Sequence, residues 1–231
     1  MATYTLEPAI LEMFPAFRRG VVVATGIDNS SADPETGRLL AAAAANASAE
    51  PAKIEVWNDA YRKFGADPGK FTPSIRFLHE QIRRGKPPRS ISKVVDLFNI
   101  ISLRWTAPCG GDDLTAIEGG DLLLGLAHGD ETFAPLFKPT AIDHPSPGEV
   151  IYYTPQTRRV LCRRWTWRNA DFSKIAPGTR AVAINIDMMT PPFTEADLES
   201  GLADLSEMLR RFCGGEVRTQ VLQLSTPSFS L

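Results

Sequence analysis

The stretch from Ser90 to Leu124, SISKVVDLFNIISLRWTAPCGGDDLTAIEGGDLLL, contains the boundary between a helical and a strand-rich part of the chain. Its first half has one apolar stripe at helical spacing, formed by Ile91, Val94, Val95, Phe98 and Ile101. We expect this helix to end near Trp105, because Pro108 and the pair Gly110-Gly111 follow. Beyond that point, short apolar runs alternate with turn residues, which indicates strands.

The same division holds on both sides of this stretch. Before it, a β-branched run predicts a strand at 19–27, and helical patterns follow at 34–50, 51–65 and 73–85. After it, strands are expected at 121–127, 149–154, 159–167 and 180–188, then a helix from Thr194 and a strand at 217–224. This order favours an α+β fold. No repeat or long linker interrupts it, so we expect one domain over residues 1–231.

The composition is that of a globular protein, with 43% hydrophobic and 23% charged residues among 231. No basic start followed by an apolar run suggests export, and the apolar stretch 39–45 is too short to cross a bilayer. We therefore expect a cytoplasmic protein without a membrane partner. The three cysteines and three histidines lack metal-ligand spacing, and no nucleotide-binding loop or nucleophile elbow occurs. Neither a metal nor a cofactor is expected.

The net charge of -2 conceals an uneven distribution. Two segments, 76–93 and 158–180, are strongly basic, whereas 112–149 is acidic with Lys138 as its only cation. Basic segments attract phosphate even in a nearly neutral protein. Solvated surface faces explain the same pattern, so charge alone does not separate the two interpretations.

The segment APCGGDDL, 107–114, is the first candidate site. Gly110 and Gly111 expose backbone N–H groups that can hold a developing oxyanion. Asp112 and Asp113 can bind an ammonium group or a metal ion. The alternative is an ordinary turn with two solvated carboxylates, because Gly and Asp are frequent turn residues.

The second candidate is RRWTWR, 163–168. Strand alternation would place Arg163, Trp165 and Trp167 on one face and Arg164, Thr166 and Arg168 on the other. One face then offers indoles for base stacking, and the other offers guanidinium groups for phosphate or carboxylate. The alternative is a pair of core tryptophans beside surface arginines.

Four further polar residues stand in apolar surroundings. Asn99 lies on the edge of the apolar helix. Glu149 begins the expected strand 149–154 and is either a residue of the strand entry or a pocket carboxylate. Asn185 and Asp187 are in phase along the strand at 180–188, so both should face the same side. That side of the strand either faces a functional site or is exposed to solvent.

The stretch Val95 to Leu124 resembles the centre of the B3/B4 editing domain of the phenylalanyl-tRNA synthetase beta subunit. The resemblance rests on a helix that carries Asn99, a turn led by Pro108, and the pair Asp113-Leu114 ahead of a strand. The segments WNDAYRKFGADPGKFTPSIRFLHEQI, PGEVIYYTPQTRRVLCRRWTWRN and TRAVAINID occur in the family's order. The resemblance covers most of residues 57–187, and the chain is similar to a stand-alone form of the domain.

The resemblance implies a barrel-like mixed β-sheet surrounded by helices, with a pocket for the aminoacylated 3′ end of tRNA. It implies that Asn99, Gly110 and Gly111 position the ester and the water. Gly110 stands where the synthetase commonly has His, Asn185 where it has the carboxylate that reads tyrosine, and Asp187 where it has a small residue. Tyrosine selectivity is therefore not expected, and Asp187 favours a cationic or hydroxylated side chain.

The hypothesis from the sequence is trans-acting hydrolysis of mischarged aminoacyl-tRNA, with a free amino acid as product and no DNA partner. Arg164 and Arg168 would meet phosphate or carboxylate groups of the substrate. This hypothesis requires a hollow between Gly110 and the strands that carry Arg164 and Asn185. Two alternatives stay open: a non-catalytic module that binds tRNA or an amino acid, and a metal-dependent enzyme that uses Asp112 and Asp113.

Overall fold

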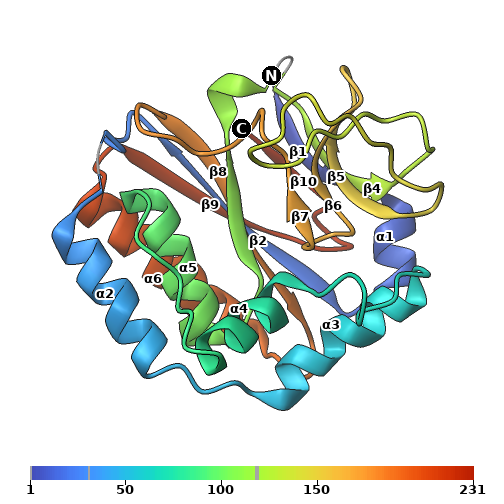
Figure 1. Cartoon of the computed structure of the whole chain (residues 1–231). Helices are drawn as coiled ribbons and strands as arrows, with labels where there is room; N and C mark the ends of the chain where they lie inside the picture. The colour runs from blue at the N-terminus through green and yellow to red at the C-terminus, as the bar shows by residue number, and fades with distance from the viewer. Residues whose placement is uncertain (1, 31, 118–119) are drawn as a thin grey trace.

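The computed structural model describes residues 2–30, 32–117 and 120–231. Over these ranges the chain forms six α-helices and two β-sheets (Figure 1). The helices gather mainly in the first half and the strands mainly in the second, as expected from the sequence, and the α+β class is confirmed.

The smaller sheet has four antiparallel strands in the order β3 (Cys109–Asp113), β8 (Ala181–Met189), β2 (Phe17–Thr25) and β9 (Glu216–Leu222). Strands β8 and β2 are the two inner strands, and Val21, Val22 and Val23 of β2 are fully buried or nearly so on both faces. Strand β3 lies at one edge and pairs only with β8 within the described residues.

The larger sheet has six strands in the order β10 (Ser228–Ser230), β1 (Thr3–Leu6), β4 (Leu122–Leu126), β5 (Val150–Thr154), β6 (Arg159–Arg163) and β7 (Arg168–Asn169). The pair β1–β4 is parallel and the others are antiparallel. No strand pairing in the described part of the chain joins the two sheets. The barrel-like sheet implied by the resemblance is therefore not seen, and two packed sheets take its place.

Four helices, α2 (Pro34–Ala45), α4 (Ser74–Arg83), α5 (Lys93–Trp105) and α6 (Glu195–Phe212), lie on the side of the four-stranded sheet away from the larger sheet (Figure 1). Helices α1 (Pro8–Met13) and α3 (Pro51–Lys63) contribute to the core between the sheets. Helix starts follow their sequences: Asp33 caps α2, and Thr194 with Asp197 forms a capping box at α6. No described helix is long and apolar enough to span a lipid bilayer.

Strand β8 shows how the two layers share one sheet. Its even residues, among them Ile184 and Ile186, pack on the helices, whereas Ala183 packs into the core between the sheets. Asn185 and Asp187 have the same parity as Ala183 and face the same side, as predicted. That side is the gap between the sheets and not the solvent.

Two local predictions are wrong. The Gly-Gly-Asp-Asp segment is not a turn but the edge strand β3, followed by a 3-10 helix at Leu114–Ala116. The expected strand 159–167 ends at Arg163, because Arg164 and Trp165 have positive φ angles of 46° and 64° and turn the chain into β7. The predicted alternation of tryptophan and arginine faces therefore does not exist.

Candidate functional site

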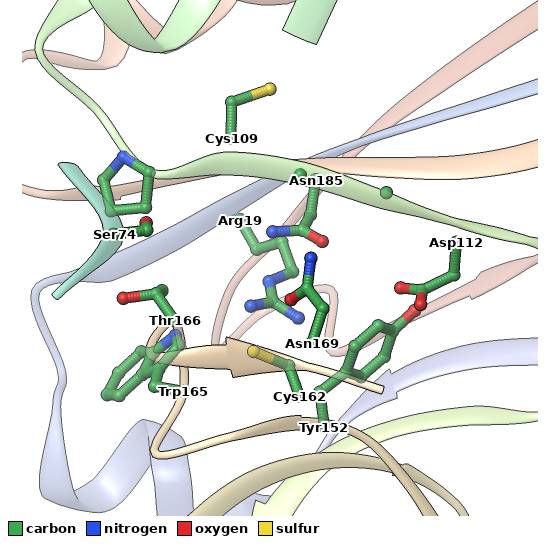
Figure 2. Close-up of a pocket in the computed structure, with 13 residues that line it drawn as sticks. Arg19, Ser74, Cys109, Asp112, Tyr152, Cys162, Trp165, Thr166, Asn169 and Asn185 are labelled. Atoms are coloured by element: carbon green, nitrogen blue, oxygen red, sulfur yellow. The ribbon is translucent and has the colours of Figure 1, made fainter. Parts of the chain in front are cut away.

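A polar pocket lies between the two sheets at the edge formed by β3 (Figure 2). Its volume is about 70 Å³, which is room for a few waters or one small polar group, since one water needs roughly 10–15 Å³. Its walls include Gly110, Gly111, Asp112, Asn185, Tyr152, Thr166 and Asn169. We call this hollow the polar pocket.

Gly110 and Asn185 are direct partners in the β3–β8 register and face the polar pocket together. No atom lies within 4 Å of the place where a Cβ on Gly110 would stand, so the missing side chain leaves open space. The side-chain amide of Asn185 enters that region (Figure 2). The predicted hollow beside these two residues therefore exists.

Gly111 supplies a backbone donor at the rim. Peptide groups of an antiparallel strand point alternately toward and away from its partner. Asp113 donates its N–H to Ser173 and the Cys109 carbonyl accepts from Ser102, so both point away from β8. Gly111, between them, has the same orientation and presents its N–H at the open edge. A Cβ here would lie 2.9 Å from the carbonyl of Ala183, so only glycine fits.

Asp112 is a buried carboxylate without a cationic partner in the described residues. It is 7% exposed and accepts a hydrogen bond from Ser173 Oγ at 2.6 Å. Burial raises the pKa of the Asp112 carboxyl to about 7, and the Ser173 hydroxyl and the charge of Arg19 oppose this rise. A carboxyl that titrates near neutral pH is suited to accept and release a proton.

Tyr152 directs a second proton-bearing group into the polar pocket. The side chain is 3% exposed and stacks on the ring of Tyr4. Among the described residues the Tyr152 hydroxyl makes no hydrogen bond of good geometry. In Figure 2 the ring extends toward the carboxyl of Asp112. Burial raises the pKa of Tyr152 well above its usual range, and the nearby Tyr4 hydroxyl adds to this rise, so the Tyr152 hydroxyl stays protonated and can donate. A buried hydroxyl that costs free energy when unpaired favours a ligand that pairs it.

Asp187, by contrast, is committed within the protein. Its carboxylate binds Arg19 through two contacts of 2.6 and 2.5 Å and accepts the indole N–H of Trp165 at 3.0 Å. Both partners of the ion pair are essentially inaccessible. Burial opposes the charge on Arg19, but Asp187 and its neighbours outweigh this and raise the pKa of Arg19. The expectation that Asp187 reads a substrate side chain is wrong.

The two cysteines at the polar pocket are poor nucleophiles. Burial raises the pKa of the Cys162 thiol to about 12, and burial also raises that of Cys109. Figure 2 shows the thiol of Cys109 pointing away from the pocket. Since the thiolate is the reactive form, covalent catalysis by either residue is disfavoured.

Trp165 and Glu149 are structural. Trp165 is 2% exposed and packs edge-on against Phe14, Phe17 and Trp57, so its indole is closed to base stacking. Glu149 accepts two hydrogen bonds from Arg163, at 2.8 and 2.7 Å, on the larger sheet. It does not line the polar pocket. The interpretation of Glu149 as a pocket carboxylate is wrong.

Arg164 lies beside the polar pocket and not in it. Its guanidinium stacks on Phe71 at 3.6 Å and on Trp167 at 4.8 Å, and Arg168 lies over Trp167 at 5.6 Å. We call Phe71, Arg164, Trp167 and Arg168 the cation–aromatic cluster. It borders the polar pocket through Thr166, which lies between its members in sequence, and Ser74, three residues after Phe71.

Asp113 and Asn99 lie apart from this arrangement. Asp113 caps the 3-10 helix through Thr115 and accepts from Thr179 Oγ1 at 2.5 Å. Adjacent residues of a strand point to opposite faces, so Asp112 and Asp113 do not chelate one ion together. Asn99 is half-buried on α5 outside the residues that line the polar pocket. Among the described residues no cluster of three His, Cys, Asp or Glu residues could hold a metal.

Sequence reasoning missed Arg19, Tyr152, Asn169 and Ser173. Tyr152 and Arg19 occur in strands that read as core, and Asn169 and Ser173 in a segment without a motif. A charged residue at the start of an otherwise apolar strand, as in Arg19 before GVVVA, was the one feature that could have indicated a buried partner.

A match to a known protein family establishes to which family the chain is related. The family model for the B3/4 domain matches residues 56–214. The chain belongs to the B3/4 domain family. The resemblance stated from the sequence is thereby confirmed, and the matched residues include both β3 and β8 of the polar pocket.

One solved structure similar to this B3/4 domain protein is an N-terminal fragment of the phenylalanyl-tRNA synthetase beta-subunit from Pyrococcus horikoshii. The two share 12% sequence identity with a TM-score of 0.48, over 94% of this chain and 50% of that one. The chain thus spans about half the length of that fragment. No curated protein matches the sequence.

Proposed function

We propose that this B3/4 domain protein hydrolyses the ester of mischarged aminoacyl-tRNA in trans. Membership of the B3/4 family suggests a role related to tRNA. The observation that carries the proposal is the buried Asp112 carboxyl, with a pKa of about 7, in a pocket that also holds an unpaired tyrosine hydroxyl. This pair offers a proton acceptor and a hydrogen-bond donor at one place.

Asp112 is the group that activates water in this proposal. Ionised Asp112 accepts a proton as the water oxygen attacks the ester carbonyl carbon, and a tetrahedral intermediate forms. The ester C–O bond then breaks, and the 3′-terminal oxygen of the tRNA takes up the proton from Asp112. The products are the free amino acid and uncharged tRNA. An aminoacyl ester is already activated, so orientation of water and ester supplies much of the required rate gain.

The oxyanion of the intermediate needs preorganised donors. The N–H of Gly111 at the open edge of β3 is the backbone candidate, and the hydroxyl of Tyr152 and the amide of Asn185 are the side-chain candidates. Donors fixed in a buried site stabilise developing charge more than water does. Asn185, half-buried in register with Gly110, can also hold the α-ammonium group through its amide oxygen.

The cation–aromatic cluster suits the RNA end of the substrate. Arg164 is largely buried against Phe71 and Trp167, whereas Arg168 is exposed and free to approach a phosphate. Aromatic rings and guanidinium planes stack on unpaired bases, such as those at the 3′ end of tRNA. In this arrangement the terminal ribose reaches the polar pocket past Ser74 and Thr166.

A panel of purified tRNAs, each charged with a different amino acid, tests the proposal. We expect at least one to be deacylated, and we expect Asp112→Asn to lower kcat/KM by about 10²–10⁴-fold, the usual contribution of a general base. The rate above spontaneous hydrolysis should rise with pH through about 7 and then level off, because Asp112 acts in its ionised form. Asp59→Asn, an exposed carboxylate on α3, is the matched control and should leave the rate unchanged.

Two outcomes would overturn this function. Binding of charged tRNA without hydrolysis of any member of the panel selects the non-catalytic binding module instead. Hydrolysis that survives Asp112→Asn at full rate removes Asp112 from the mechanism.

A further inference from the structure

A second hollow adjoins the polar pocket on the far side of Asp112. Its volume is about 310 Å³, and its walls are mostly apolar, including Ile91, Val95, Phe98, Leu136, Phe137 and Ile175. We call it the apolar pocket. Helix α5 with the residues before it supplies one wall, and the segments around Leu136 and Ile175 supply the others.

The two hollows share a boundary. Gly111, Asp112 and Asn169 line both of them. In the hydrolysis proposed above, the Gly111 N–H binds the oxygen of the ester carbonyl and the Asp112 carboxyl binds the attacking water. A substrate whose ester lies at this boundary therefore has one part on each side.

The opposite end of the polar pocket fixes the direction. Ser74 and Thr166 stand there beside the cation–aromatic cluster, whereas neither lines the apolar pocket. From Phe71 and Arg164 the path to the apolar pocket thus leads through the polar pocket and the boundary at Asp112, and Arg168 stands beside Asn169 at that boundary. With the RNA end at the cluster, the acyl part of the substrate extends into the apolar pocket.

We propose that the apolar pocket binds the amino acid side chain of the substrate and selects large apolar side chains. This inference rests on the proposed function. At about 70 Å³ the polar pocket is too small for such a side chain together with the ester, whereas about 310 Å³ accommodates a leucine or phenylalanine side chain. The polar side chains that line the apolar pocket besides Lys174 are Asp112 and Asn169, and both stand at the boundary where the ester is placed. A hydroxylated or cationic side chain that extends beyond them therefore meets apolar walls.

The charges around the apolar pocket agree with this assignment. Lys174 is the only cation among its lining residues, and both oxygens of Asp171 hold its ammonium group, at 2.8 and 2.9 Å. Ile91 and Phe137 are 58% and 77% exposed at the rim. An apolar ligand would remove this surface from water, which favours its binding.

The test uses rim variants, because they leave the core intact. Phe137→Ala should lower kcat/KM for leucyl-tRNA and phenylalanyl-tRNA by about 10-fold or more, since the loss of one or more methylene contacts has effects of that size. Alanyl-tRNA and glycyl-tRNA should change less than about 2-fold, because their side chains do not reach the rim. Phe77→Ala, 54% exposed on α4 and outside both pockets, is the matched control.

A filling variant gives the opposite test. Ala176 lines the apolar pocket and is half-buried, so Ala176→Leu places new atoms in the hollow. We expect it to exclude phenylalanyl-tRNA while alanyl-tRNA is still hydrolysed. Equal losses for all substrates, or none, would overturn the assignment of the pocket to the side chain.

A binding measurement separates this inference from the proposed function. Adenosine that carries the amino acid in a 3′ amide cannot be hydrolysed, and its affinity is measured by calorimetry. Leucyl and phenylalanyl amides should bind at least about 10-fold more tightly than the alanyl amide, and Phe137→Ala should abolish the difference. Selective binding without deacylation of any tRNA would support the pocket and refute the hydrolase. Deacylation with equal affinity for all amides would refute the pocket alone, and loss of plain adenosine binding on Phe137→Ala would assign the pocket to the base.

Discussion

Asp187 and Asp112 are buried aspartates in the same gap between the sheets, but they have opposite surroundings. Asp187 forms an ion pair with Arg19 through two hydrogen bonds and also accepts a hydrogen bond from the Trp165 indole N–H. Asp112 accepts one hydroxyl, that of Ser173, and its pKa rises to about 7. One carboxylate is held in an ion pair, whereas the other can change its protonation state near neutral pH.

The difference shows why a polar residue in phase on a strand does not by itself indicate a ligand contact. Both aspartates would have the same appearance in the sequence, and Asp187 has the more apolar neighbours. What separates them is whether a cation on a neighbouring strand lies in register, as Arg19 does with Asp187. A site for chemistry lies where a buried charge lacks such a partner.

Asp187→Asn removes the ion pair with Arg19 and should lower the free energy of unfolding more than any other variant proposed here. It leaves the guanidinium of Arg19 buried without its counter-ion, and removal of one partner of a buried pair costs about 3–5 kcal/mol. Urea unfolding followed by tryptophan fluorescence measures this loss. Adding Arg19→Met should recover part of it, because the uncompensated charge is then gone.

The matched control for that variant is the exposed pair Arg62 and Asp59, whose side chains are 55% and 68% exposed. Asp59→Asn should leave the urea midpoint nearly unchanged, since solvent screens surface pairs. A similar cost at both sites would contradict the distinction between a structural and a surface ion pair.

Asp112→Asn tests the aspartate that lacks a cation, through the pH dependence of the free energy of unfolding. The folded pKa of about 7 lies above the ordinary value of 3.8, so the unfolded chain loses this proton first as pH rises. Wild-type stability should therefore fall relative to the variant between about pH 4 and pH 7 and run parallel to it above. At about 1.4 kcal/mol per pKa unit, the difference approaches roughly 4 kcal/mol. Urea midpoints from pH 4 to 8 test this, and a constant offset would refute it.

Local sequence patterns predicted helices α2 to α6, because these carry their own start and stop signals, whereas α1, β1 and β10 were not predicted. Helix α3 starts at Pro51 and ends at Lys63 before Gly65, and α6 follows the Thr194 cap. Strand β8 was also predicted to within one residue, together with the common orientation of Asn185 and Asp187. These features depend on spacing along the chain, which the sequence contains.

The site depended on pairings between distant segments, and these could not be predicted. Glycine and aspartate have low strand propensity, so Cys109–Asp113 resembles a turn until β8 supplies its partner. The turn at Arg164 and Trp165 lacks glycine, asparagine and proline. Two positive φ angles there cost about 1–3 kcal/mol each, which the packing of Trp165 into the core offsets. The prediction of one domain over residues 1–231 stays a prediction.

Ser173→Ala is the finest test of the comparison, because it removes the one side-chain hydrogen bond that the Asp112 carboxyl accepts in the described part of the chain. Ser173 is fully buried, and its hydroxyl stabilises the ionised carboxyl from 2.6 Å. Without it the pKa of Asp112 should rise further, by about 1 unit, since a hydrogen bond to a charged group contributes about 1.5–3 kcal/mol. The midpoint of the pH–rate profile for deacylation should move to higher pH by the same amount, and activity at pH 9 should stay near the wild-type level.

Ser206→Ala is the control for that shift. Ser206 is a buried serine on α6 whose hydroxyl has no hydrogen-bond partner within the described ranges. Its removal should leave the pH midpoint unchanged, although both variants lose one hydroxyl from the interior. If Ser173→Ala lowered activity equally at every pH, Ser173 would hold the loop around it in place without acting on Asp112. The midpoint, and not the rate at one pH, therefore distinguishes a residue that tunes the carboxyl from one that only supports the fold.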